Sequence, residues 1–402
     1  MRPHVTLHCT PDRDHRIVMD EALVAPFDLP RLLGSDADPL DWPARRAALL
    51  MQFEDHVFGR VPKFELTTAF EPTEEGSGFD GRAVRRQGRL RLLAGTEQIS
   101  LTIELLLYLP ADAFDPVPVF LVPNFEGNHT IAHDPHIVES FGARRDRGDD
   151  LAPRGSKVRR FPIRTIVDRG YGLATFYAAD VDSDSDDGFA HGVHRAGYVR
   201  GQHAPAADEW GTIGAWAWAC SRVADLLRDD PSIDGDRVIV GGHSRLGKTA
   251  LWAAARDTRF AAAFANDSGC TGAALSRRRF GENVAVINDL FPHWFCRNYR
   301  CYANNEANLP IDQHQLIALI APRPVHIASA DGDLWADPRG EFLATLAASE
   351  AWEHLGGEGL GLREFPDPGD WSIGQVGYHL RKGEHDMLAF DWERFLDFAD
   401  QL

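Results

Sequence analysis

Residues 236–252 read DRVIVGGHSRLGKTALW and are the most informative segment of the sequence. Its apolar run 238–240 is short and ends at glycines, as expected of a strand buried on both faces. From residue 247 the pattern becomes that of a helix, and a sharp turn that carries Ser244 lies between the two. The stretch therefore predicts a strand, a tight turn and a helix in direct succession.

This turn admits two functional interpretations. Gly242 to Thr249 satisfies the P-loop pattern G-x-x-x-x-G-K-[ST], with Asp267 after the next apolar run as a metal-binding aspartate. The same residues fit a nucleophile elbow, G-x-S-x-G, except that Leu246 occupies the last glycine position. A P-loop commonly follows the first strand of its core, whereas several strands precede this turn. We favour the elbow and keep a P-loop nucleotide-binding protein as the remote alternative.

An elbow serine needs an acid and then a histidine further along the chain. Downstream, the run RPVHIASAD ends in a polar stretch that contains Asp331 and Asp333. The stretch KGEHD then places His385 in a polar loop just before the last helical pattern, and His379 competes for the same role. The order serine, acid, histidine is thus available, and a P-loop protein requires none of it.

The surrounding chain predicts the fold class. Short apolar runs alternate with helical patterns over the C-terminal two thirds, which argues for a parallel sheet covered on both faces. The expected strands are 117–125, 173–180, 236–242, 260–267 and 323–331, and the expected helices are 214–229, 247–257 and 390–402. Before them, three stretches alternate in the manner of antiparallel strands, at 64–72, 81–93 and 99–110. We expect an α/β three-layer sandwich, mostly parallel, with antiparallel N-terminal strands.

The N-terminal part has a different character. Residues 41–62 fit one amphipathic helix, with Pro43 near its start and Gly59 past its end. We expect an N-terminal helical extension over residues 1–60 and a single catalytic domain over 61–402. The first fifteen residues carry charges where a signal peptide needs an apolar stretch, which predicts a cytoplasmic protein as the sequence stands, or a secreted or periplasmic one if its start was trimmed.

Composition excludes several classes of protein. The 402 residues are 44% hydrophobic, which excludes a disordered chain, and no apolar run of about 18 residues suggests a membrane span. Lys and Arg number 42 against 60 Asp and Glu, and the net charge of −18 disfavours nucleic acid and anionic membranes as partners.

The cysteines do not suggest a disulfide scaffold or a zinc ribbon. There are five, without a CxxC pair, at positions 9, 220, 270, 296 and 301. The odd number leaves at least one free thiol. A bridge within the set Cys270, Cys296 and Cys301 is possible, but the spacing does not identify one.

Several long stretches resemble one known family. They are VPNFEGNHT, RGYGLATFYAADVD, GHSRLGKTALW, SGCTGAALSRRRFGE, FPHWF, LIAPRPV, ASADGDLWADPRGEF and GEHDMLAFDW. Together they resemble the glucuronoyl esterases, carbohydrate esterases of bacterial type, from the extension helix to the C-terminus. The resemblance implies an α/β-hydrolase fold and hydrolysis of (4-O-methyl-)glucuronic acid esters, as in lignin–glucuronoxylan linkages, with no cofactor and no metal. A serine esterase of other acyl specificity is the alternative.

The resemblance also implies residue roles. Ser244 would be the nucleophile and His385 the base, since the family aligns the histidine of GEHD. Arg245 would support the oxyanion with its backbone N–H and its side chain. The acid stays open. Many members of the family carry a glutamate where this chain has the shorter Asp267, whereas Asp333 lies where α/β-hydrolases generally place the acid. We favour Asp333, and the two could also share the task.

Three further residues resemble those that hold the glucuronoyl ring in the family. Lys248 and Glu282 can bond adjacent sugar hydroxyls, and Trp335 offers an apolar wall. The acidic run DVDSDSDDG, residues 180–188, lacks the ligand pattern of an EF-hand and predicts a solvated loop near the site. The expected partner is a small-molecule or polysaccharide ester of glucuronate, and we expect a monomer.

Overall fold

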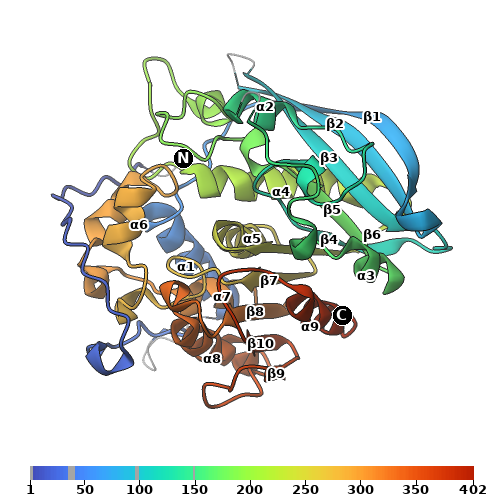
Figure 1. Cartoon of the computed structure of the whole chain (residues 1–402). Helices are drawn as coiled ribbons and strands as arrows, with labels where there is room; N and C mark the ends of the chain where they lie inside the picture. Colours follow the sequence, from blue (N-terminus) through green and yellow to red (C-terminus); the bar gives the residue numbers. More distant parts are fainter. Residues whose placement is uncertain (1–2, 35–40, 96–98, 148–149) are drawn as a thin grey trace.

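A ten-stranded sheet organises the chain, and the computed structural model describes residues 3–34, 41–95, 99–147 and 150–402. The strand order is β1-β2-β3-β5-β4-β6-β7-β8-β10-β9, from β1 at the top right of Figure 1 to β9 at the bottom. The strands are β1 Leu66–Gly78, β2 Ala83–Ala94, β3 Ile99–Pro110, β4 Val117–Leu121, β5 Gly172–Phe176, β6 Ile233–His243, β7 Ala262–Asn266, β8 Val325–Ala330, β9 Trp371–Ser372 and β10 Val376–Arg381.

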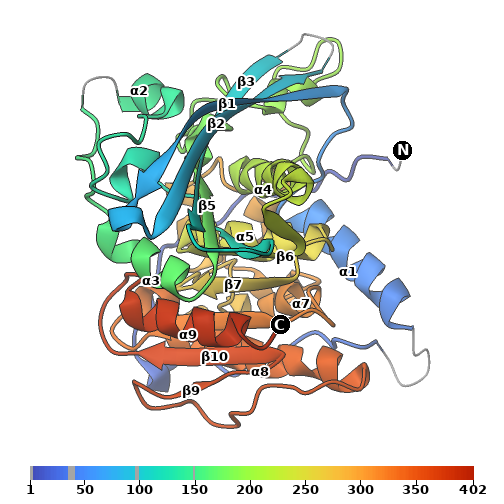
Figure 2. The same ribbon diagram turned by 90° about the vertical axis from the view of Figure 1, so that its right-hand side faces the viewer.

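Helices cover both faces of this sheet. They are α1 Trp42–His56, α2 Phe141–Arg147, α3 Ile163–Asp168, α4 Thr212–Asp229, α5 Arg245–Arg256, α6 Val284–Leu290, α7 Gln313–Ala318, α8 Pro338–His354 and α9 Ala389–Ala399. Helices α4, α5, α7 and α8 pack together on one face, where α1 joins them through Phe53 against Trp252. Helices α3 and α9 pack against the sheet in a second group (Figure 2). This layering confirms the predicted three-layer α/β-hydrolase sandwich.

Strand direction divides the sheet as the sequence predicts. Strands β1, β2 and β3 form an antiparallel series, and β3 pairs antiparallel with β5. The run β5-β4-β6-β7-β8-β10 is parallel, because each of its strands returns through a helical layer. The core lies on both sides of these strands. Val240 and Trp252 belong to one buried apolar cluster, whereas Phe264 and Trp392 belong to the other.

The parallel strands end at one common edge. In register, His243 of β6 lies beside Asn266 of β7, and Asn266 lies beside Ala328 of β8. Ala330 at the end of β8 pairs with Arg381 at the end of β10. Residues that directly follow these strands therefore meet in space although they are far apart in the sequence.

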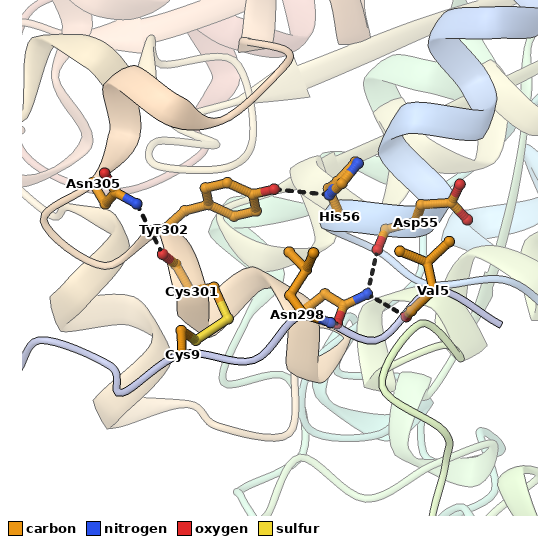
Figure 3. Close-up of a disulfide and its surroundings, with 9 residues drawn as sticks. Val5, Cys9, Asp55, His56, Asn298, Cys301, Tyr302 and Asn305 are labelled. Atoms are coloured by element: carbon orange, nitrogen blue, oxygen red, sulfur yellow. Dashed lines mark hydrogen bonds between the residues drawn. A yellow bond between two sulfur atoms is a disulfide. The ribbon is translucent and has the colours of Figure 1, made fainter.

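The N-terminal segment is tied to the rest of the molecule by a disulfide. Cys9 and Cys301 are bonded, with their Cα atoms 5.5 Å apart (Figure 3). Beside them, the Asn298 side chain donates to the carbonyl oxygens of Val5 and Asp55, at 2.8 Å each. The bridge considered from the sequence within the set Cys270, Cys296 and Cys301 is wrong.

The two remaining candidates for that bridge are free thiols. Cys270 and Cys296 are buried, and Cys301 pairs instead with Cys9, 292 positions away, which local spacing could not reveal.

The predicted helix of the extension is confirmed as α1, capped by the Asp41 side chain. The division at residue 60 stays a prediction. Within the described ranges, no helix combines the length and apolarity that crossing a bilayer requires.

Candidate active site

Ser244 lies at the tip of a strained turn between β6 and α5. Its φ is 57° and its ψ is −130°, a conformation that costs a non-glycine residue of order 1–3 kcal/mol. The turn is so tight that a Cβ at Gly242 would lie 2.3 Å from the Leu246 carbonyl oxygen. Only glycine therefore fits at position 242. The side chain of Ser244 is partly exposed. This is the geometry of a nucleophile elbow.

The same turn does not suit a phosphate. The backbone N–H groups of Gly247 and Lys248 both donate to the Ser244 carbonyl oxygen, at 2.9 and 3.2 Å. A P-loop instead leaves successive N–H groups free to cradle phosphate oxygens. The Lys248 ammonium group is buried and donates to the Ser268 carbonyl oxygen at 2.5 Å. The turn geometry therefore argues against the P-loop interpretation.

His385 follows β10 in the loop before α9, on the same edge as Ser244. Its Nδ1 lies 2.5 Å from Oδ2 of Asp333, and its side chain is 41% exposed. The ring centroid stands 4.5 Å from that of His243, the residue before Ser244. With Nδ1 bonded to a carboxylate, Nε2 is the nitrogen available for proton transfer.

His243 forms a neutral support beneath His385. Its Nδ1 is 2.6 Å from the Asn266 side-chain oxygen. Burial, and next the nearby His385, lower the pKa of His243 well below its usual value. It therefore adds no positive charge that would oppose protonation of the neighbouring imidazole. The competing histidine, His379, is enclosed, with both ring nitrogens bonded to buried partners.

Asp333 and Asp267 lie close together but have different partners. Asp333 precedes the short 3₁₀ helix Leu334–Ala336 and bonds the imidazole of His385. Asp267 accepts from the Ala330 backbone N–H at 2.8 Å and from Arg381 at 3.1 Å. Burial, and next the charge of Glu341, raise the pKa of Asp267 against the lowering effect of Arg381. Of the two, Asp333 is the carboxylate in contact with His385.

These residues also form the one described group of three potential metal ligands. One ligand atom from each of Asp267, Asp333 and His385 lies within 4.8 Å of the others. The contacts among them are those of a hydrogen-bonded network, because His385 Nδ1 already bonds Asp333 and both oxygens of Asp267 already accept. Cation binding here would have to displace those bonds.

Arg245 is fixed beside the nucleophile. It is the first residue of α5, so its backbone N–H is one of the donors that a helix start leaves unpaired within the helix. Its Nε lies 2.6 Å from Oδ2 of Asp184, and its guanidinium carbon lies 4.5 Å from the centre of the Phe125 ring. Two donors at one helix start suit a developing oxyanion.

Asp184 is itself held in place. It accepts from His293 Nε2 at 3.0 Å and from the Trp294 indole N–H at 2.7 Å. Burial tends to raise the pKa of Asp184, but the bond from His293 and the charge of Arg245 hold it below its usual value. This carboxylate therefore stays ionised and keeps Arg245 oriented.

The solvated loop expected for the acidic run is wrong for its first half. Asp180 is buried and accepts from the backbone N–H groups of Glu104 and Gly142. Asp182 is buried and bonds Thr212 at 2.6 Å and His194 at 3.1 Å. Alternating aspartates in this run serve as hydrogen-bond acceptors inside the fold, which composition alone does not distinguish from a solvated loop.

The three residues expected to hold a sugar lie together. Lys248 Nζ is 3.8 Å from Oε2 of Glu282, and both side chains are buried. Burial raises the pKa of Glu282, and the charge of Lys248 opposes that effect. The Trp335 carbonyl oxygen accepts from the Glu282 backbone N–H at 2.9 Å. Trp335 is 37% exposed, which makes it an accessible wall and not a core residue.

Two groups were missed by the sequence reasoning. Asp184, His293 and Trp294 lie behind Arg245, and the motif FPHWF was the available signal for the last two. Arg381 lies behind Asp267, and its signal was a charged residue at the end of an apolar strand.

Comparisons with known proteins place the chain beside carbohydrate esterases. A family described as "Glucuronyl esterase, fungi" matches residues 201–356. A curated carbohydrate esterase from an unknown prokaryotic organism is 44% identical over 95% of this chain and 91% of its own length. The 4-O-methyl-glucuronoyl methylesterase of Hypocrea jecorina is 36% identical over 155 residues, or 36% of this chain and 34% of that protein.

Solved structures give the same result. The glucuronoyl esterase from Solibacter usitatus has a TM-score of 0.88 and 38% identity, covering 94% of this chain and 99% of that one. A promiscuous esterase of carbohydrate esterase family 15, from a marine bacterial metagenome, has a TM-score of 0.88 and 42% identity, covering 96% and 99%.

Proposed function

The chain belongs to the glucuronoyl esterase family of carboxylic ester hydrolases, and on that premise we propose that it cleaves esters of glucuronic acid, including 4-O-methylated forms, with Ser244, His385 and Asp333 as its triad. The observation that carries the proposal is the contact between His385 Nδ1 and Asp333 at the sheet edge that also holds the strained Ser244. We infer that its natural substrates are the esters that link lignin to glucuronoxylan.

The reaction is a two-step acyl transfer. Ser244 Oγ attacks the ester carbonyl while His385 Nε2 accepts its proton, and Asp333 orients the imidazole and stabilises the imidazolium. The Arg245 backbone N–H and guanidinium stabilise the oxyanion of the tetrahedral intermediate. His385 then protonates the departing alcohol, and water releases glucuronate by the same route in reverse.

Sugar specificity comes from the buried pair beside the nucleophile. Lys248 lies one helical turn beyond Ser244, with one donor engaged by the Ser268 carbonyl oxygen. The remaining ammonium protons and the Glu282 carboxylate can bond neighbouring sugar hydroxyls, and Trp335 can cover the ring face. A site built to bond hydroxyls discriminates strongly against substrates that lack them.

Initial rates on three esters test this proposal. Benzyl glucuronate, methyl glucuronate and p-nitrophenyl acetate are compared for the wild type, S244A and K248A, with the exposed Lys63→Ala as the matched control. S244A should lose a factor of about 10⁴ or more on every ester. K248A should lose far more on the two glucuronates than on the acetate.

Two outcomes would contradict the proposal. Activity of folded S244A within tenfold of the wild type would exclude the serine mechanism. Equal losses of K248A on all three esters, with acetate the better wild-type substrate, would favour an esterase of other acyl specificity.

We further propose that the protein works in an oxidising compartment, such as the periplasm or the extracellular space. The disulfide between Cys9 and Cys301 supports this, because such bonds are rare in reducing cytosol. Alkylation of denatured protein taken from its native host should label three thiols, at Cys220, Cys270 and Cys296. Labelling of all five would contradict the proposal.

A further inference from the structure

Arg381 is the last residue of β10, and its side chain contacts the backbone of the loop that carries His385. Its guanidinium donates to the carbonyl oxygen of Glu384 at 2.6 Å and to that of Asp386. These two residues flank His385 in the chain. One buried side chain, only 3% exposed, therefore holds the backbone on both sides of the histidine.

The guanidinium is itself anchored by two carboxylates from other elements. Asp267, after β7, accepts from Arg381 Nη2 at 3.1 Å, and Asp391 of α9 accepts from its Nε at 3.0 Å. Asp391 also accepts from the Leu388 backbone N–H at 2.6 Å, where the loop enters α9. Arg381 thus connects β7, β10 and α9 to one short loop.

This arrangement fits the needs of His385. The imidazole is 41% exposed, so packing alone leaves it weakly constrained. The Asp333 contact sets the tilt of the ring, but the position of the Cα depends on the backbone of the loop. The guanidinium presents Nε to Asp391 and Nη2, whose two protons are shared among three oxygens, to Asp267 and the two carbonyl groups. A lysine ammonium group cannot place its donors in this planar array.

We infer that Arg381 is a positioning residue for the esterase reaction: it sets the place of His385 through the carbonyl oxygens of Glu384 and Asp386, with Asp267 and Asp391 as its counter-charges. The inference rests on the proposed roles of Ser244 and His385. It also gives Asp267 a task other than that of the triad acid.

A matched pair of substitutions tests the inference. R381K keeps the charge but loses the planar fork. R85K is the control. Arg85 is also 3% exposed and also bonds two carboxylates, Glu74 and Asp134. It lies on β2, which is at the other end of the strand order from β10. Each variant is measured for kcat, KM and thermal unfolding on benzyl glucuronate and p-nitrophenyl acetate.

The two variants should separate stability from catalysis. Both should lower the unfolding temperature. R381K should also lose about 10²-fold in kcat on both esters at a nearly unchanged KM, because a small displacement of the base slows proton transfer without removing a substrate contact. R85K should retain kcat within about twofold, since it touches nothing at the site.

The results that would overturn the inference are distinct from those that would overturn the proposed function. An R381K kcat equal to that of R85K, while S244A is inactive, removes the positioning role and leaves the triad intact. An active S244A removes the proposed function itself. If R381K does not fold, D267N carries the test with an expected loss of about tenfold in kcat at constant KM, and wild-type kcat in D267N then overturns the inference.

Discussion

The loops after β7 and β8 start from nearly the same place and end in different roles. Each carries a buried aspartate within reach of His385: Asp267 directly follows β7, and Asp333 is the third residue after β8. Asp333, in the β8 loop, bonds the imidazole. Asp267, in the β7 loop, bonds Arg381 and the backbone of Ala330. A position at this edge of the sheet brings an aspartate close enough to serve as the triad acid. Which hydrogen-bond donor contacts the aspartate then determines whether it takes that role.

The difference has a simple physical origin. An unpaired arginine in the interior would lower the stability of the fold, because its charge is removed from water without compensation. Arg381 instead forms ion pairs with two nearby carboxylates, Asp267 and Asp391. Asp267 is one of these: its Oδ2 accepts from Arg381, and its Oδ1 accepts from the Ala330 backbone N–H, so both of its oxygens are occupied. Asp333 has no arginine partner among the described contacts, which leaves it to His385.

The largest expected effect comes from Asp333. D333N should lower kcat by about 10⁴, because an amide neither holds the required tautomer of His385 nor stabilises the imidazolium. Steady-state rates on p-nitrophenyl acetate measure this without depending on sugar contacts. A loss below tenfold in a folded D333N variant would show that Asp333 is not the triad acid.

The effect of Asp267 should be much smaller. D267N keeps the shape of the side chain but removes one counter-charge of Arg381, so we expect a loss of about tenfold in kcat. The ratio of the two kcat losses, measured on the same ester, gives the relative importance of the two aspartates for catalysis. If D267N falls to the level of S244A while D333N stays near the wild type, the roles assigned to the two loops are reversed.

A longer side chain after β7 should recover part of the loss from β8. In the D333N background, D267E adds one carbon–carbon bond of about 1.5 Å, and the ligand atoms involved lie within 4.8 Å. We expect kcat of the double variant to exceed that of D333N by about tenfold. No gain, with the fold intact by circular dichroism, would show that length is not what separates the two aspartates.

The smallest catalytic effect is expected far from both loops. Replacing Cys9 and Cys301 by serine removes a bond that closes a segment of 292 residues, which should cost about 2–5 kcal/mol in the free energy of unfolding. Neither sulfur touches the site, so kcat should change less than about threefold. Urea unfolding and steady-state rates check the two quantities, and a large loss of kcat in the folded variant would contradict the separation of the two regions.

The elbow and the layered sheet could be predicted because their signals are local. Ser244 lies between an apolar run and a helical pattern, and the glycine at 242 is required by a backbone contact four residues away. The alternation of strands and helices can likewise be recognised from the apolar pattern of a single sequence. These features depend on neighbours in the chain.

The rest depended on contacts between distant segments. Cys9 pairs across 292 residues, and Asp184 reaches Arg245 across 61 positions. The choice between Asp267 and Asp333 depended on Arg381, which the sequence showed only as a charge at the end of a strand. No pattern of spacing specifies which donor will face which carboxylate once the strands are aligned.

The hydrogen bond between His385 and Asp333 can be observed directly in solution. Proton NMR should show a low-field Nδ1–H resonance that H385Q removes, since a charge-assisted bond to a carboxylate deshields its proton. D267N should retain this resonance and D333N should abolish it. A resonance that survives in D333N and disappears in D267N would show instead that the imidazole is held by the loop after β7.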